Sequence, residues 1–200
     1  MTTSLIYVMG ASGCGKDSLL SYGRDRLAGL PGVQFAHRYI TRSAHAGGEN
    51  HVSLSAQEFD ARNKAGLFAM HWKSHGHDYG IGIEINQWLA KGITVVVNGS
   101  REYLDAARQS YPEIFPVWVE VAPDILRERL QLRGRESESD IAARLMRHQS
   151  MSRTRRDGII ISNDGLLAEA GEALVAVLKE QIAQQTTQKP KQQSNQILCA

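Results

Sequence analysis

Short apolar runs alternate with segments of helical periodicity along most of the chain. The runs LIYVM (5–9), ITVVV (93–97), FPVWVEV (115–121) and GIIIS (158–162) are rich in β-branched residues and predict buried strands. Each is followed by a segment with helical spacing, which predicts helices over about 16–30, 101–111, 123–133, 140–151 and 164–183. This alternation is typical of an α/β fold with a parallel sheet covered on both faces.

Residues 33–92 break the alternation. They hold short strand-like pieces, a helix opened by the capping box SAQE (Ser55 with Glu58), and the turn-rich stretch HGHDYGIG (75–82). We expect a lobe inserted over the carboxyl edge of the sheet, where open α/β folds bind ligands. From Gln184 onward the chain is polar and Gln-rich, which predicts a disordered tail behind a single domain over 1–183.

The stretch GASGCGKDSL (10–19) lies between the first predicted strand and the first predicted helix. Glycines at this spacing let backbone N–H groups curl around phosphate oxygens, the helix N-terminus adds partial positive charge, and Lys16 can reach the β- and γ-phosphates. An ordinary glycine-rich turn would not need Gly13, Gly15 and a lysine together. The pattern predicts a nucleotide-binding P-loop, made of Gly10, Ala11, Ser12, Gly13, Cys14, Gly15, Lys16, Asp17 and Ser18.

Asp17 stands where P-loops carry the Ser or Thr that holds magnesium. A carboxylate could ligate Mg²⁺ directly, since this ion prefers hard oxygen donors. Alternatively Ser18 supplies the hydroxyl, or water and the nucleotide hold the metal, or Asp17 only favours the helix N-terminus. We favour a place for Asp17 in the metal shell, directly or through water. Cys14 is expected to be a small loop residue, because no base is evident beside it.

An arginine-rich segment surrounds Gly134, and Ser137 with Asp140 forms a second capping box. Guanidinium groups at such a hinge suit a lid over 133–147, which would neutralise two phosphate groups as they approach and exclude water. A solvated, charged helix pair is the alternative, and it fits Arg127 and Arg129. The lid interpretation is preferred for Arg133, Arg135 and Arg144.

The lobe is locally basic, which predicts an anionic second substrate. Six of the seven histidines lie between His37 and His77, together with several Lys and Arg residues and few carboxylates. His71, His75 and His77 could be read as a zinc trio. We discount it because a turn around Gly76 disrupts helical spacing and no ligand cysteine is near.

Bulk composition narrows the function classes. The chain has 200 residues, 42% of them hydrophobic, and a formal net charge of +2, which gives no global field for nucleic acid. No apolar run approaches the roughly 18 residues needed to cross a bilayer. The two cysteines show no pairing pattern, which indicates a reducing compartment. We expect a cytoplasmic protein that binds neither nucleic acid nor membranes, with a homodimer as one option for its assembly.

Together these residues resemble the guanylate kinase group of P-loop phosphotransferases over about 5–180. The matching stretches are GASGCGKDSL, HRYITR followed by GGEN, EF at 58–59, HGHDYGI, GITVVVN, RGRESESDIAARL and ISNDG. Within this group the chain is most similar to the ribose 1,5-bisphosphate phosphokinase family, through GKDSL, HRYITR, GGENH, HG-x-x-YGI and VVVNGSR. The expected fold is therefore a three-layer P-loop NTPase with a parallel central sheet, an inserted acceptor-binding lobe and an arginine-rich lid.

That family converts ribose 1,5-bisphosphate and ATP to 5-phosphoribosyl 1-diphosphate and ADP, within phosphonate breakdown. The resemblance implies ATP and Mg²⁺ as cofactors and a phosphorylated sugar as the small-molecule partner. It also implies roles for particular residues: catalysis by Lys16, Arg133, Arg135 and Arg144; acceptor binding by Arg38, Arg42, His45, Glu49, Tyr79 and Asn98; metal binding by Asp17 and Ser18; and proximity of Asn163 and Asp164 to the ATP base.

The chain departs from guanylate kinases where those enzymes read guanine and hold its phosphate. His51 or Val52, His71 or Trp72, and Ile81 replace an aromatic hydroxyl, a carboxylate and a hydroxyl, and His45 replaces the second arginine of TR-x-x-R. Guanylate kinase or another nucleoside monophosphate kinase is the closest alternative. A non-catalytic guanylate-kinase-like interaction module is a minor one, because such modules typically lose the loop lysine and lid arginines.

Asn98 occupies the place of the magnesium-associated carboxylate that follows the central strand in guanylate kinases. A charge is therefore lost at the sheet edge and gained at Asp17 on the loop. Our hypothesis is that one metal-shell carboxylate has moved between these two positions.

Overall fold

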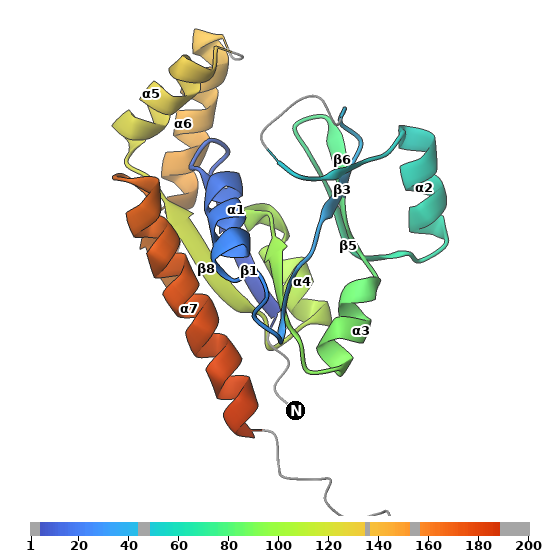
Figure 1. Cartoon of the computed structure of the whole chain (residues 1–200). Coiled ribbons are helices and arrows are strands. Elements are labelled where there is room, and N and C mark those ends of the chain that lie inside the picture. Colours follow the sequence, from blue (N-terminus) through green and yellow to red (C-terminus); the bar gives the residue numbers. More distant parts are fainter. Residues whose placement is uncertain (1–4, 44–48, 135–136, 153–156, 189–200) are drawn as a thin grey trace, which may run out of the picture.

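A parallel sheet of five strands forms the centre of the molecule (Figure 1). The computed structural model describes residues 5–43, 49–134, 137–152 and 157–188. The strands lie in the order β2-β7-β1-β8-β9, and every neighbouring pair is parallel. Their bounds are β1 Leu5–Gly10, β2 Val33–Phe35, β7 Thr94–Asn98, β8 Phe115–Glu120 and β9 Ile159–Ser162. The four predicted strands are thus confirmed, with ends shifted by one residue.

Helices cover both faces of this sheet, as the alternating pattern predicted. On one face lie α1 (Lys16–Arg26), α5 (Pro123–Arg133), α6 (Glu138–Ser152) and α7 (Leu167–Gln188). The other face is covered by α3 (Glu84–Ala90) and by α4 (Leu104–Ser110), which follows the 3₁₀ turn η2 (Arg101–Tyr103). Strand β1 serves both layers, because Ile6 faces one core and Tyr7 the other.

Several helix ends differ from the prediction. Helix α1 ends at Arg26, four residues early, and the predicted helix over 101–111 begins as a 3₁₀ turn. Helix α7 begins at Leu167 rather than at residue 164, because Asp164 uses its carboxylate to accept from the Ala122 N–H at 2.6 Å. Side chains that bond elsewhere compete with a helix start, and spacing alone does not reveal this.

The predicted tail begins too early. Helix α7 continues to Gln188, five residues into the stretch predicted to be disordered. Glutamine is a good helix former, and Gln184 donates from Nε2 to Glu180 Oε1 one turn earlier at 3.3 Å. Residues 189–200 lie outside the described residues.

A second, four-stranded sheet of order β4-β3-β6-β5 forms the lobe, which stands beside the carboxyl edge of the central sheet in Figure 1. It consists of β3 (Arg38–Ile40), β4 (Val52–Ser53), β5 (Phe68–Ser74), β6 (His77–Gly82) and the helix α2 (Ala56–Lys64). Ser55 caps this helix as predicted, because its hydroxyl accepts from the Glu58 N–H at 3.1 Å, whereas the Glu58 carboxylate bonds Arg62 one turn later.

The lobe is smaller than the predicted range 33–92. Strand β2 pairs with β7 in the central sheet, and α3 buries Ile85 and Leu89 against that sheet. The stretch 75–82 is mostly strand, and only His75 and Gly76 form a turn, with φ values of 48° and 76°. Two consecutive positive φ values are typical of a two-residue hairpin turn.

Candidate active site

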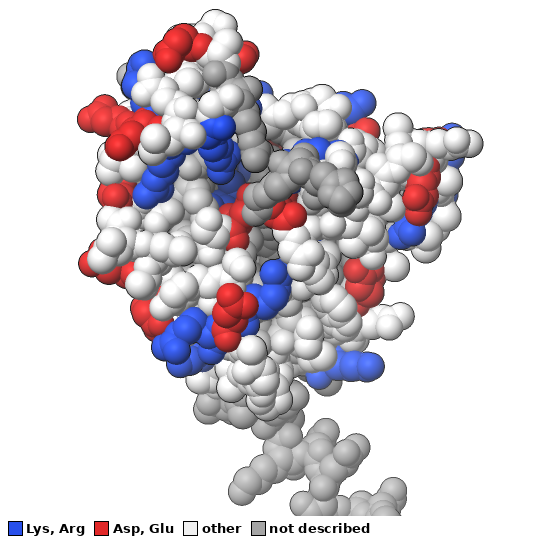
Figure 2. All heavy atoms as spheres, turned by 45° about the horizontal axis from the view of Figure 1, so that its top comes forward, with Lys and Arg blue, Asp and Glu red and all other residues white. Residues whose placement is uncertain are grey.

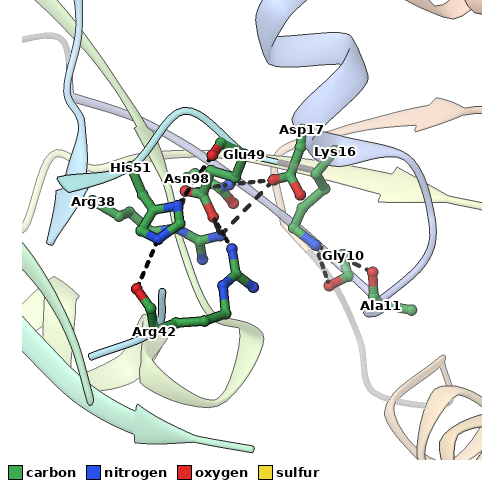
Figure 3. Close-up of polar contacts among 9 residues, drawn as sticks. All are labelled: Gly10, Ala11, Lys16, Asp17, Arg38, Arg42, Glu49, His51 and Asn98. Atoms are coloured by element: carbon green, nitrogen blue, oxygen red, sulfur yellow. Dashed lines mark hydrogen bonds and ion pairs between the residues drawn. The ribbon is translucent and has the colours of Figure 1, made fainter. Parts of the chain in front are cut away.

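The P-loop wraps around the N-terminus of α1, directly after β1. Lys16 Nζ donates to the carbonyl oxygens of Gly10 at 3.2 Å and Ala11 at 3.1 Å, so its ammonium group lies inside the loop (Figure 3). Gly15 precedes the helix with φ 90°, a conformation that glycine adopts without steric cost. Cys14 is fully buried in the core, as expected for a structural loop residue.

Two residues after β9 support the loop from behind. Asn163 is buried and donates from Nδ2 to the Cys14 carbonyl at 2.7 Å. Asp164 accepts from the Ala122 N–H and from the Ser162 hydroxyl at 2.7 Å, and these bonds lower its pKa. Both side chains therefore hold backbone in place, and neither lines the cleft described next. Their proximity to the ATP base stays a prediction.

A cleft of about 230 Å³ opens in front of the P-loop. Basic side chains from four parts of the chain line it, and Figure 2 shows such side chains beside a hollow that holds carboxylates deeper down. The basic residues are Lys16 of the loop, Arg38 and Arg42 of the lobe, Arg101 after β7, and Arg133, Arg144 and Arg147 of the α5–α6 pair. The sequence prediction named five of these seven as site residues.

The predicted lid falls on two helices, α5 and α6. Gly134 ends α5 in the left-handed conformation, and Ser137 and Asp140 bond each other reciprocally at the start of α6, as predicted. The Ser137 hydroxyl, at 2.6 Å, and the Ser137 N–H both donate to the Asp140 carboxylate, and these two bonds lower the pKa of Asp140. Arg144 donates to the Ser12 hydroxyl at 2.7 Å, so the lid contacts the P-loop. Arg135 lies outside the described residues.

Asp17 lies in a polar cluster with four predicted acceptor-site residues (Figure 3). Asn98 donates from Nδ2 to Asp17 Oδ1 at 2.7 Å, and Arg38 Nη2 is 3.8 Å from the same oxygen. Arg38 also forms a two-pronged ion pair with Glu49, whose side chain is only 9% exposed. Arg42 Nη2 lies 3.7 Å from Glu49 Oε2. Glu49 thus orients both arginines toward the cleft.

Asp17 and Asn98, the two positions named in the hypothesis of a relocated metal-shell carboxylate, are in direct contact. Asn98 is buried, and its Oδ1 finds no hydrogen-bond partner among the described residues. A buried, unsatisfied oxygen beside a carboxylate is a donor set that suits Mg²⁺. The residues present therefore fit this ion, with Ser18 also on the cleft wall.

His51 contacts the backbone of Glu49 and of Arg42, on either side of residues 44–48. The His51 ring bridges the carbonyl oxygens of Glu49 at 3.0 Å and Arg42 at 3.2 Å. His77 contacts the Thr41 carbonyl at 2.8 Å, and no group of three or more His, Cys, Asp or Glu within the described ranges could hold a metal ion. His45 lies outside those ranges. Tyr79 is buried at the cleft wall beneath the Arg38 guanidinium, which is 5.1 Å from its ring centre.

Sequence reasoning missed the far wall of the cleft, formed by Trp72, Ser74, His75, Ser100, Arg101, Glu102 and Arg147. Buried Tyr7 fixes part of it: its hydroxyl donates to the Ser100 carbonyl at 3.0 Å and accepts from the Ser100 N–H at 2.9 Å. Burial raises the pKa of Tyr7. The stretch VVVNGSR was the available signal, because it continues from the sheet edge into this wall.

No helix within the described ranges is both long and apolar enough to span a membrane. The fold has counterparts among solved structures. A guanylate kinase from Anaplasma phagocytophilum matches with a TM-score of 0.60 at 15% identity, over 90% of this chain and 86% of that one. A gluconokinase from Sinorhizobium meliloti matches with a TM-score of 0.52 at 21% identity, over 94% and 99%. The fold and the basic cleft define a P-loop phosphotransferase built like a guanylate kinase.

Sequence comparison makes the assignment more specific. Comparison with protein-family models gives no match. The chain is 56% identical over 176 residues to "Ribose 1,5-bisphosphate phosphokinase PhnN" of Thiobacillus denitrificans, covering 88% of this chain and 93% of that protein. A relative of the same name from Desulfomicrobium baculatum is 53% identical over 178 residues, or 89% and 95%. The chain belongs to the PhnN family of ribose 1,5-bisphosphate phosphokinases.

Proposed function

We propose that this protein transfers the γ-phosphoryl group of ATP to the 1-phosphate of ribose 1,5-bisphosphate, giving 5-phosphoribosyl 1-diphosphate and ADP. An oxygen of the acceptor phosphate forms the new bond to the γ-phosphorus, and the bond to the β–γ bridging oxygen breaks. Membership of the PhnN family is the observation that carries the choice of acceptor. The basic cleft in front of the P-loop supports the reaction type.

The donor half of the site is the P-loop. Its backbone N–H groups and the N-terminus of α1 would bind the ATP phosphates, and Lys16 would leave its present carbonyl partners to reach the β- and γ-phosphates. Asp17, Ser18 and the Oδ1 atom of Asn98 would hold Mg²⁺, which supplies charge neutralisation between the phosphate groups when it is bound. Asn163 keeps the loop in shape through its bond to Cys14.

The acceptor half is formed by the lobe. Arg38 and Arg42 both line the cleft, and Arg38 lies beside Asp17, so the two arginines suit the phosphate that approaches the P-loop. Glu49 holds the Arg38 guanidinium as a fixed fork, and such a fork matches the geometry of a phosphate. Tyr79 supports Arg38 from below. A contact from His45 remains part of the proposal.

The transfer step needs charge cancellation more than proton transfer. The attacking phosphate oxygen is already ionised at neutral pH, so the site does not need a strong general base. Arg144, held at the P-loop by Ser12, and Arg133 on the same wall would neutralise the charge of the transferring group. Arg135 is proposed to assist them.

The decisive experiment is a product assay by phosphorus NMR with ATP and ribose 1,5-bisphosphate. We expect the resonances of a sugar diphosphate and of ADP. A panel of GMP, AMP, CMP and UMP in a coupled ADP assay tests the alternative acceptors. Strong turnover of GMP without turnover of the sugar bisphosphate would overturn the proposal. Failure to bind ATP in calorimetry would instead favour an interaction module.

Lys16→Ala tests the donor half. Removal of a positioned charge at the transferring phosphate typically costs roughly two or more powers of ten in kcat, and we expect that loss with an unchanged fold by circular dichroism. Lys64→Ala is the matched control, because the Lys64 side chain is 75% exposed on α2 and pairs with Asp60 within the lobe. Near-normal turnover of the Lys16 variant would refute the assignment of the loop.

A further inference from the structure

The proposed acceptor carries two phosphate groups, and the contacts above account for only one of them. Arg38 lies next to Asp17 on the loop, where the reacting 1-phosphate must meet ATP, and Arg42 shares the carboxylate of Glu49 with Arg38. The 5-phosphate, on the other side of the ribose ring, needs a separate binding site. The following inference therefore rests on the proposed function.

The far wall of the cleft provides a second basic end. It combines Arg101 of η2, Arg147 of α6, and Ser74 and His75 at the tip of the β5–β6 hairpin. Three separate elements thus bring hydrogen-bond donors to one wall. This wall follows β7, the strand beside β1 on the lobe side of the sheet. Asn163, by contrast, reaches the P-loop from the β9 side.

Helix α6 connects the P-loop end of the cleft with its far wall. Arg144 and Arg147 are three residues apart on α6, so they are neighbours on its surface. Arg144 reaches Ser12 of the P-loop, whereas the Nε of Arg147 lies 3.3 Å from Glu102 Oε1 on the far wall. Glu102 is the carboxylate among the described residues of this wall, which therefore carries two arginines, Arg101 and Arg147, against one acidic side chain.

His75 brings its ring nitrogens to this wall from the tip of the hairpin. Its φ of 48° is the left-handed conformation that the two-residue turn requires. Partial burial and the positive charges of Arg144 and Arg147 lower the pKa of His75, while Glu102 opposes this effect. The ring therefore lies in the field of both lid arginines.

We infer that Arg101, Arg147, His75 and Ser74 form a binding site for the second, non-reacting phosphate monoester of the acceptor. Arg101 and Arg147 supply the charge, and the hairpin tip closes the site from the lobe. This site would set the distance between the 1-phosphate and the P-loop. It also selects a bisphosphorylated sugar over a sugar that carries one phosphate.

The test compares ribose 1,5-bisphosphate with ribose 1-phosphate as acceptors in the full-length enzyme. We choose Arg101→Gln, and His75→Asn because asparagine tolerates the positive φ of the turn. For ribose 1,5-bisphosphate each variant should raise KM by about tenfold or more, the scale of one lost charge-assisted hydrogen bond. The kinetic constants for ribose 1-phosphate and the KM for ATP should stay unchanged.

Lys73→Gln is the matched control, since Lys73 is a 73% exposed cation on the same hairpin and does not line the cleft. It should leave the preference for the bisphosphate intact. Equal losses on both acceptors in the Arg101 and His75 variants would overturn the inference and leave the proposed function standing. A wild-type enzyme that ignores ribose 1,5-bisphosphate would refute the proposed function and this site with it.

Discussion

Exchange of the polar groups at positions 17 and 98 tests the moved-carboxylate hypothesis. In Asn98→Asp, the Nδ2 donor that lies 2.7 Å from Asp17 Oδ1 is replaced by a second carboxylate. In Asp17→Ser, the loop regains the hydroxyl that P-loops usually carry. The double variant restores one carboxylate and one hydroxyl, with their places exchanged.

The magnitude follows from the contact. Asn98→Asp removes a hydrogen bond to a charged group, worth about 1.5–3 kcal/mol. It also places two carboxylates in contact, and such a pair repels by about 4 kcal/mol at 4 Å and an effective dielectric constant of 20. The Asp17 side chain is 33% exposed and Arg38 is near, so solvent and this cation reduce the repulsion. We expect the single variant to lose about 2–4 kcal/mol of unfolding free energy without Mg²⁺.

The assay is a double-mutant cycle. Unfolding in urea without metal gives stability, and titration of the ATP complex with Mg²⁺ gives metal affinity. We expect the double variant to recover most of the stability and metal affinity that the single variants lose, with a coupling of about 2 kcal/mol, within the range found for residues in contact. Additive effects within about 0.5 kcal/mol in both measurements would refute the hypothesis.

Two further predictions concern the supports of the site. In Gly15→Ala, the new Cβ would lie 2.3 Å from the Asn163 amide nitrogen, and the positive φ costs about 1–2 kcal/mol more. Urea unfolding should therefore show a lower free energy of unfolding, and calorimetry should show weaker ATP binding. Unchanged values in both measurements would contradict this prediction. Burial lowers the pKa of His148, although its ring donates to the Val121 carbonyl. The folded state therefore resists protonation, so stability should be complete above about pH 6.5 and fall as the pH decreases below that value. His148→Gln should reduce this fall between pH 7.5 and 5.5, and an identical pH dependence would count against the assignment.

Local chemistry made much of the fold predictable. The P-loop pattern, the N-cap bonds of Ser55 and Ser137 and the four β-branched runs depend on residues a few positions apart, and all of them form. Strand β2, with only three residues, and helix α3 were assigned to the lobe. A short apolar pattern shows that a segment must be buried and does not show against which surface.

In the candidate site, too, some features follow from the local sequence and others from the packing of distant segments. By itself the sequence determined the residue types that handle phosphate, because a glycine loop with a lysine and clustered arginines have few other uses. Only the tertiary structure decided which of them face one another: Asp17 meets Asn98 across 81 positions, and Arg144 meets Ser12 across 132. It alone also brought Arg101, His75 and Arg147 onto one wall. Pairings between distant segments depend on how whole layers pack, and no periodicity along the chain records that packing.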